Sequence, residues 1–139
     1  MKKINFQEAL NQVIKDDPRF AEDAYVFLRE ALDFTVKLLD KPTEGPARHI
    51  SGQELIQGIR QYALQEFGPL ALRVLNTWGI HRTLDFGEMV YNLIRVGIMG
   101  KTDEDRVEDF ANGFDFEDAF TKPFQPRRQT RAARAAGLN

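Results

Sequence analysis

Along most of the chain, hydrophobic residues recur every three to four positions and polar residues fill the gaps. This period is typical of amphipathic helices, so the pattern predicts a mainly α protein of five to six helices. The first helix is expected from Asn5 to about Lys15. Asn5 is a good capping residue, and Glu8 follows it at the spacing of a capping box.

A second, longer helix is expected from Pro18 to about Asp40. Asp17 is a good N-cap, and proline is favoured at the first position of a helix. A second apolar stripe lies beside the main one, so we expect this helix to pack on more than one side. That stripe consists of Phe20, Phe27 and Phe34. The stretch 41–46, with two prolines and a glycine, marks the main break in the chain.

Paired signals indicate the later helices. Ser51 with Glu54 is a capping box, which predicts a helix over residues 51–66. Ile50 and Leu55 stand at the two positions of a hydrophobic staple, which supports the same start.

A short helix over residues 69–78 begins at a proline, and Gly79 is expected to end it in the left-handed conformation. Asp85 with Glu88 repeats the spacing of a capping box and predicts a helix over residues 85–97.

The helices at 51–66, 69–78 and 85–97 follow one another in the order of a helix-turn-helix unit. Residues 98–101 and 114–116 could pair as a small β-ribbon, which would make the C-terminal half winged-helix-like. A plain helical bundle is the alternative, and the pattern leaves both open.

Charge is unevenly distributed. Residues 1–121 hold 14 basic and 21 acidic side chains, a net charge of −7, whereas residues 122–139 hold five basic and no acidic side chains. This division predicts a single helical domain over 1–121 and a flexible basic tail over 122–139. The tail is expected to contact protein, RNA or a ribonucleoprotein surface through Arg127, Arg128, Arg131 and Arg134. The alternatives are a solubilising tail and a tail that pairs with the acidic run at 103–118.

Composition narrows the classes of protein further. The chain has no cysteine, which excludes disulfides and thiolate chemistry. No apolar run approaches the ~20 residues of a membrane span, and the polar start predicts no secretory signal. We therefore expect a cytoplasmic protein with no membrane contact.

Catalytic and metal signatures are weak. Ser51 is the only serine, and its hydroxyl is expected to be committed to capping. His49 and His81 are the only histidines, and neither lies in a zinc motif. Asp103 and Asp105 have a calcium-loop spacing, but the required glycine is missing. We expect neither a metal nor a cofactor.

One pocket remains conceivable. Arg48 and His49 precede a helix start, where free N–H groups and the helix dipole favour anions, and Gln53 and Glu54 would complete the site. The alternative interpretation is that Arg48 and His49 pair with acidic neighbours in a loop.

Several blocks of the sequence resemble an uncharacterised bacterial protein family, a domain of unknown function. The blocks are RHISGQELIQGIR, FGPLALRVLNTWGI, DFGEMVYNLI, KTDED and FDFEDAF, together with DPRF near the start. The resemblance covers about residues 5–120 and implies a compact bacterial cytoplasmic domain. It implies no activity, substrate or catalytic residue.

The leading hypothesis is a non-enzymatic binding or adaptor protein, with an acidic body for protein and an arginine-rich tail for RNA or a ribonucleoprotein surface. A small enzyme or ligand-binding domain with a pocket near Arg48 and His49 is one alternative. A DNA-binding winged-helix regulator is another, but Asp85 and Glu88 at the start of its recognition helix oppose phosphate contact.

Overall fold

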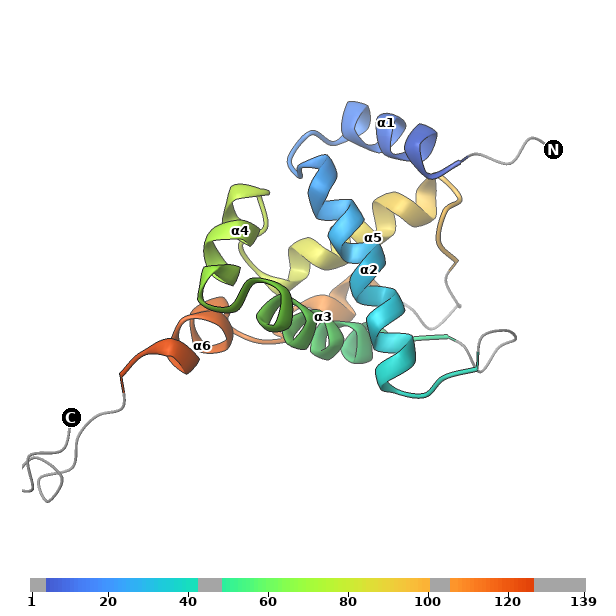
Figure 1. Cartoon of the computed structure of the whole chain (residues 1–139). Coiled ribbons are helices and arrows are strands. Elements are labelled where there is room, and N and C mark those ends of the chain that lie inside the picture. Colours follow the sequence, from blue (N-terminus) through green and yellow to red (C-terminus); the bar gives the residue numbers. More distant parts are fainter. Residues whose placement is uncertain (1–4, 43–48, 101–105, 127–139) are drawn as a thin grey trace, which may run out of the picture.

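The computed structural model describes residues 5–42, 49–100 and 106–126, and Figure 1 shows them as a set of packed helices. No strand occurs in these ranges, so the predicted mainly α class is confirmed. The α-helices are α1 (Phe6–Asp16), α2 (Glu22–Leu38), α3 (Gly52–Phe67), α4 (Ala71–Thr77), α5 (Thr83–Arg95) and α6 (Phe116–Phe120). Short 3-10 turns are η2 (Gly68–Leu70), η3 (Val107–Phe110) and η4 (Lys122–Phe124).

Two predicted helix starts are confirmed at atomic detail. The Asn5 side chain accepts a hydrogen bond of 2.8 Å from the backbone N–H of Glu8 and caps α1. At α3, the Ser51 hydroxyl accepts from the Glu54 N–H at 3.1 Å, and the Glu54 carboxylate accepts from the Ser51 N–H at 3.0 Å. This reciprocal pair is the predicted capping box.

The predicted start of the second helix is wrong. Helix α2 begins at Glu22, with Ala21 at its N-cap position, rather than at Pro18. Asp17 does not cap it, because the Asp17 carboxylate accepts hydrogen bonds from the Arg19 side chain and from Asn92 of α5. A tertiary contact therefore takes the side chain that the local pattern assigned to capping.

The second capping box is also misplaced. Helix α5 begins at Thr83, so Asp85 is its third residue and not its N-cap. The Asp85 carboxylate reaches back to accept from the backbone N–H groups of His81 at 2.8 Å and Arg82 at 3.2 Å. An aspartate can stand at either position, and only the backbone around it decides which it takes.

The predicted β-ribbon is absent from the described residues. Gly97 adopts a φ of +84°, and the N–H of Ile98 bonds back to the Leu93 carbonyl, so the chain turns where a strand was expected. Asp115 caps α6 by accepting from two backbone N–H groups, and Phe116 is already helical. Lys101 lies outside the described residues.

The most extensive contact between helices joins α2 and α3 (Figure 1). A Cβ atom added to Gly58 of α3 would lie only 1.7 Å from the Thr35 hydroxyl oxygen of α2. Thr35 is buried and donates its hydroxyl to the Ala31 carbonyl at 2.7 Å, so its polar group is satisfied within its own helix. The absence of a side chain at Gly58 lets the two helix backbones approach.

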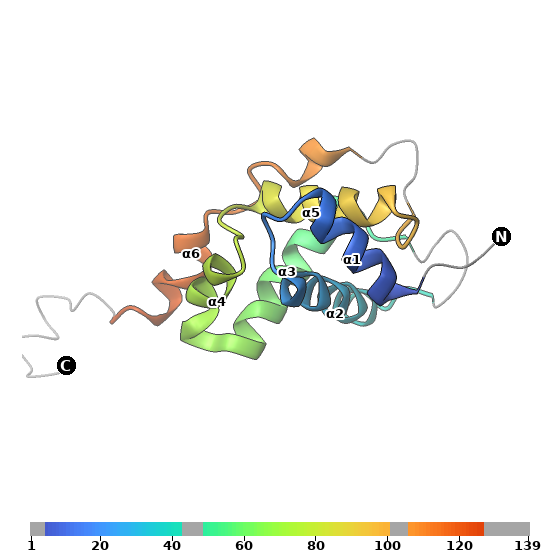
Figure 2. The same cartoon turned by 90° about the horizontal axis from the view of Figure 1, so that it is seen from above.

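Phe110 of η3 closes the other side of the core, where η3 lies over α5 (Figure 2). A Cβ atom on Gly87 of α5 would come within 2.7 Å of the Phe110 side chain, and one on Gly52 of α3 within 3.0 Å. Helix α5 also packs against α1, so most of its surface is covered.

We expect Gly58→Ala to destabilise the fold by about 1–3 kcal/mol, because the added methyl group overlaps Thr35 and must push α2 from α3. Urea unfolding monitored by circular dichroism measures the change. The control is Gly100→Ala, where nothing lies within 4 Å of the new methyl group. Equal stability changes in the two variants would contradict the contact.

Candidate functional site

The pocket predicted at the start of α3 is occupied by structural contacts where the structure describes it. Gln53 donates to the Asp109 carbonyl at 2.6 Å and thereby ties α3 to η3. Glu54 forms the capping box, and its other oxygen lies 3.5 Å from Lys41. Hydrogen bonding from the Ser51 backbone lowers the pKa of Glu54. His49 is half-buried, and Arg48 lies outside the described residues.

The arginines predicted to bind a partner, and His81, for which no site was predicted, are placed as follows. Arg127, Arg128, Arg131 and Arg134 lie outside the described residues. His81 is exposed, and its Nδ1 atom lies 3.1 Å from the Asn76 side-chain oxygen within one local turn. Residues 122–126, assigned to the tail from sequence, include η4, and Lys122 pairs with Asp118.

A polar network with a buried centre at Tyr25 and Asn92 links α2, α5 and the turn after α1. Asn92 donates one hydrogen bond to the Asp17 carboxylate and one to the Tyr25 hydroxyl, both at 3.0 Å. The Arg19 guanidinium meets Asp17 through two bonds of 2.8 Å and meets Glu88 of α5 on its other side. Sequence reasoning missed this network because no local pattern relates its members.

Three members of the network have shifted pKa values, and the hydrogen bond to Asp17 raises the pKa of Arg19. Hydrogen bonds from Arg19 hold the pKa of Asp17 well below its usual range. Burial raises the pKa of Tyr25, whose side chain is fully enclosed. The carboxylates of the network bond to Arg19 or Asn92, which hold them in place and do not activate them for a reaction. The arrangement is therefore that of a structural support.

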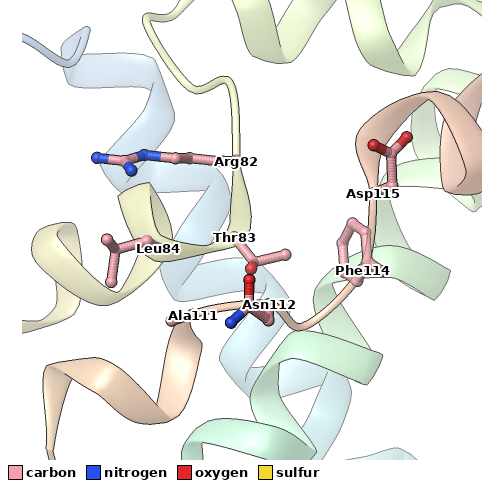
Figure 3. A pocket seen from close by; sticks show the side chains of 7 residues that line it. All are labelled: Arg82, Thr83, Leu84, Ala111, Asn112, Phe114 and Asp115. Atoms are coloured by element: carbon pink, nitrogen blue, oxygen red, sulfur yellow. The ribbon is translucent and has the colours of Figure 1, made fainter.

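A surface hollow of about 310 Å³ lies between the start of α5 and the segment before α6 (Figure 3). Its polar groups are largely used by the fold: the Thr83 hydroxyl donates to the Phe110 carbonyl and accepts from the Gly113 N–H. The Arg82 side chain extends away from Asp115 (Figure 3). The hollow is lined by Arg82, Thr83, Leu84, Ala111, Asn112, Phe114 and Asp115. It does not bring opposed catalytic groups together.

A row of aromatic rings follows the junction of α2 and α3 to the end of α4, and we call it the aromatic seam. Tyr62 is its centre, with ring centroids 5.2 Å from Phe34 and 5.5 Å from Phe27. Phe27 in turn lies 5.6 Å from Phe67 and 5.7 Å from Trp78. Phe27 is buried and the other four rings are half-buried, so each of those four keeps part of its surface exposed.

Two carboxylates meet at the tip of Tyr62. The Tyr62 hydroxyl oxygen lies 2.7 Å from Glu30 of α2 and 3.2 Å from Glu66 of α3. The hydrogen bond to Glu30 raises the pKa of Tyr62 above its usual range, because a phenolate would face two negative charges. Within the described part of the chain, neither glutamate pairs with a basic side chain. The seam thus combines aromatic surface with uncompensated negative charge.

The sequence signalled only half of this site. The heptad spacing of Phe27 and Phe34 predicted a helix packed on more than one side, and α2 does contact α1 as well as α3. Nothing local related that stripe to Tyr62 of α3 or to Trp78, the residue that follows α4. Among the described residues, no group of three or more His, Asp or Glu side chains could hold a metal ion. No helix in those ranges has the length and apolar character to cross a bilayer.

No family model, curated protein or solved structure matches this chain. The resemblance to an uncharacterised bacterial family therefore stays a prediction, and the functional argument depends on the sequence and the structure of this chain alone.

We expect Asp17→Asn to lower stability by about 1–3 kcal/mol at pH 7, because Arg19 loses its carboxylate partner and a donor replaces an acceptor beside Asn92. The folded pKa of Asp17 is lowered, so its contribution is present above its unfolded pKa of about 4 and is lost as pH falls. The deficit should therefore shrink at about pH 3, as measured by urea unfolding at both pH values.

Asp23→Asn is the control, since Asp23 is exposed at the start of α2 and makes no side-chain contact of this kind. A deficit of Asp17→Asn that stays constant between the two pH values would refute the ionised pairing.

Proposed function

We propose that this is a non-enzymatic binding protein of the cytoplasm, whose acidic helical body contacts a protein and whose arginines contact RNA or a ribonucleoprotein surface. The observation that carries the proposal is the separation of charge, −7 over residues 1–121 and +5 over residues 122–139. Anionic partners are held chiefly by Lys and Arg, and a net negative body directs them to the arginines.

Exposed apolar side chains supply a surface for the protein partner. Leu70 of η2 is 58% exposed and Phe124 of η4 is 46% exposed. Turn η2 lies against α6, and η4 follows α6 directly, so both side chains belong to the end of the molecule where the arginines begin (Figure 1). Apolar side chains exposed together are a common mark of protein contact sites.

The polar side chains at the start of α3 are already used in structural hydrogen bonds, which favours a binding function over a catalytic one. The side chains that could have served a reaction, Ser51, Gln53 and Glu54, hold the start of α3. Helix α5 supports binding to DNA poorly, because eight of its 13 residues are buried between α1 and η3. A winged-helix interpretation therefore requires a recognition helix with more free surface than α5 offers.

The arginines are tested by R127Q/R128Q/R131Q/R134Q in the full chain. Binding of a fluorescent single-stranded RNA should weaken as salt rises, with a slope of up to about −3 in log affinity against log salt for four phosphate contacts. The quadruple variant should lose most of that slope. The matched control removes the same charge from exposed positions of the body: K15Q/K37Q/R73Q/R95Q. RNA binding that both variants lose equally would overturn the assignment.

The protein-binding surface is tested separately, by capture from nuclease-treated bacterial lysate. Proteins retained by the wild-type chain should be lost with Leu70→Asp/Phe124→Asp. They should be kept with Leu38→Asp/Leu39→Asp, which introduces the same charge at other exposed apolar positions. Retention by both double variants would place the contact elsewhere on the body.

A further inference from the structure

The tip of Tyr62 is a place where charge is left unbalanced. Its hydroxyl carries one proton, yet both Glu30 and Glu66 lie within 3.2 Å of its oxygen. Only one of them can accept that proton in a hydrogen bond at a time. The second carboxylate faces an oxygen lone pair and a like charge, so a cation placed between the two glutamates would gain from both.

The same chain contains the completed form of this arrangement. Arg19 lies between two carboxylates, 2.8 Å from Asp17 and 2.5 Å from Glu88, and its guanidinium stands 4.9 Å from the ring centroid of Phe20. Two carboxylates, an aromatic ring and a guanidinium are therefore in mutual contact here. The aromatic seam has the two carboxylates and the aromatic rings, and lacks the guanidinium.

Guanidinium is the cation that this surface suits best. It is planar, binds carboxylates with a rigid fork of N–H groups, and stacks on aromatic faces. The half-buried rings of Phe34, Phe67 and Trp78 extend the surface on both sides of Tyr62, so more than one cation could be placed along it.

A source of arginine begins at the end of the molecule where Phe67 lies. Phe67 is followed at once by η2, η2 packs against α6, and η4 leads on to Pro126. Residues 127–139, which we call the arginine segment, then supply four arginines and no acidic residue. Thirteen extended residues span up to about 45 Å, whereas Tyr62 is only about 7.5 Å along α3 from Phe67.

We propose that the aromatic seam is a binding site for arginine side chains and that the arginine segment of the same chain occupies it, with a guanidinium bridging Glu30 and Glu66. Linkage within one chain gives the segment an effective concentration on the order of millimolar, so individually weak contacts suffice. Docking on the body would withhold these arginines from anionic partners. The proposal does not rest on RNA being that partner.

Trp78 gives a direct readout, because it is the only tryptophan of the chain and lies in the seam. A synthetic peptide of residues 127–139 is titrated into full-length protein while Trp78 fluorescence is followed. The variant R127Q/R128Q/R131Q/R134Q should bind the peptide at least about tenfold more tightly than the wild type, whose seam is already filled. Binding should weaken steeply towards about 1 M NaCl, where the Debye length is about 3 Å.

The glutamates are tested on the background of the quadruple arginine variant. Adding Glu30→Gln/Glu66→Gln should weaken peptide binding at least about tenfold, because both charges that hold the guanidinium are removed. The matched control adds Asp23→Asn/Glu108→Gln, which neutralises two exposed carboxylates outside the seam and should leave peptide binding unchanged. Circular dichroism checks that each variant is folded.

Three results would overturn the proposal. Equal peptide affinity of wild type and quadruple variant would show that the chain's own arginines do not fill the seam. Peptide binding that survives loss of both glutamates would place the site elsewhere. The weaker peptide binding of the wild type could also depend on protein concentration. Such a dependence, together with dimers in sedimentation, would assign the arginines in the seam to a second copy. The RNA measurement on the quadruple variant is independent, so either proposal can fail alone.

Discussion

The close approach of α2 to α3 at Gly58 and Thr35 is the contact on which the rest of the structure depends. With no side chain at Gly58, the two helix backbones meet without a spacer. Tyr62 is one turn further along α3 and is thereby brought between Phe27 and Phe34 of α2. Any larger residue at Gly58 would separate the rows of side chains that form both the core and the aromatic seam.

Two ionic clusters in the molecule illustrate how the same groups can serve stability or recognition. Around Arg19, carboxylates, guanidinium and aromatic ring are all present, and the cluster links the turn after α1 to α5. Around Tyr62, the carboxylates meet a neutral hydroxyl instead. In the first cluster both carboxylates meet a guanidinium. The second retains negative charge at an accessible surface, and such charge attracts a cationic partner.

The correct and incorrect predictions differ in the range of the contacts involved. Asn5 and the pair of Ser51 and Glu54 cap helices as expected, since every atom of those caps lies within three residues. Asp17 was assigned to a cap by the same reasoning, but Arg19 and Asn92 take its carboxylate. Asp85 has the expected type of role at a different position, because the backbone before α5 starts the helix two residues earlier. The Phe114–Phe116 alternation resembled a strand, yet α6 forms there under the Asp115 cap.

The sequence by itself determined the helical class, most helix positions, the break after α2 and the separation of acidic and basic charge. These features follow from hydrophobic period, capping chemistry and composition, which act over a few residues. Only the tertiary structure decided that Glu30 and Glu66 share one hydroxyl group, and that Phe34, Tyr62 and Trp78 belong to one row. Those neighbours come from separate helices, and their distances depend on how closely the helix backbones pack, which no local pattern encodes.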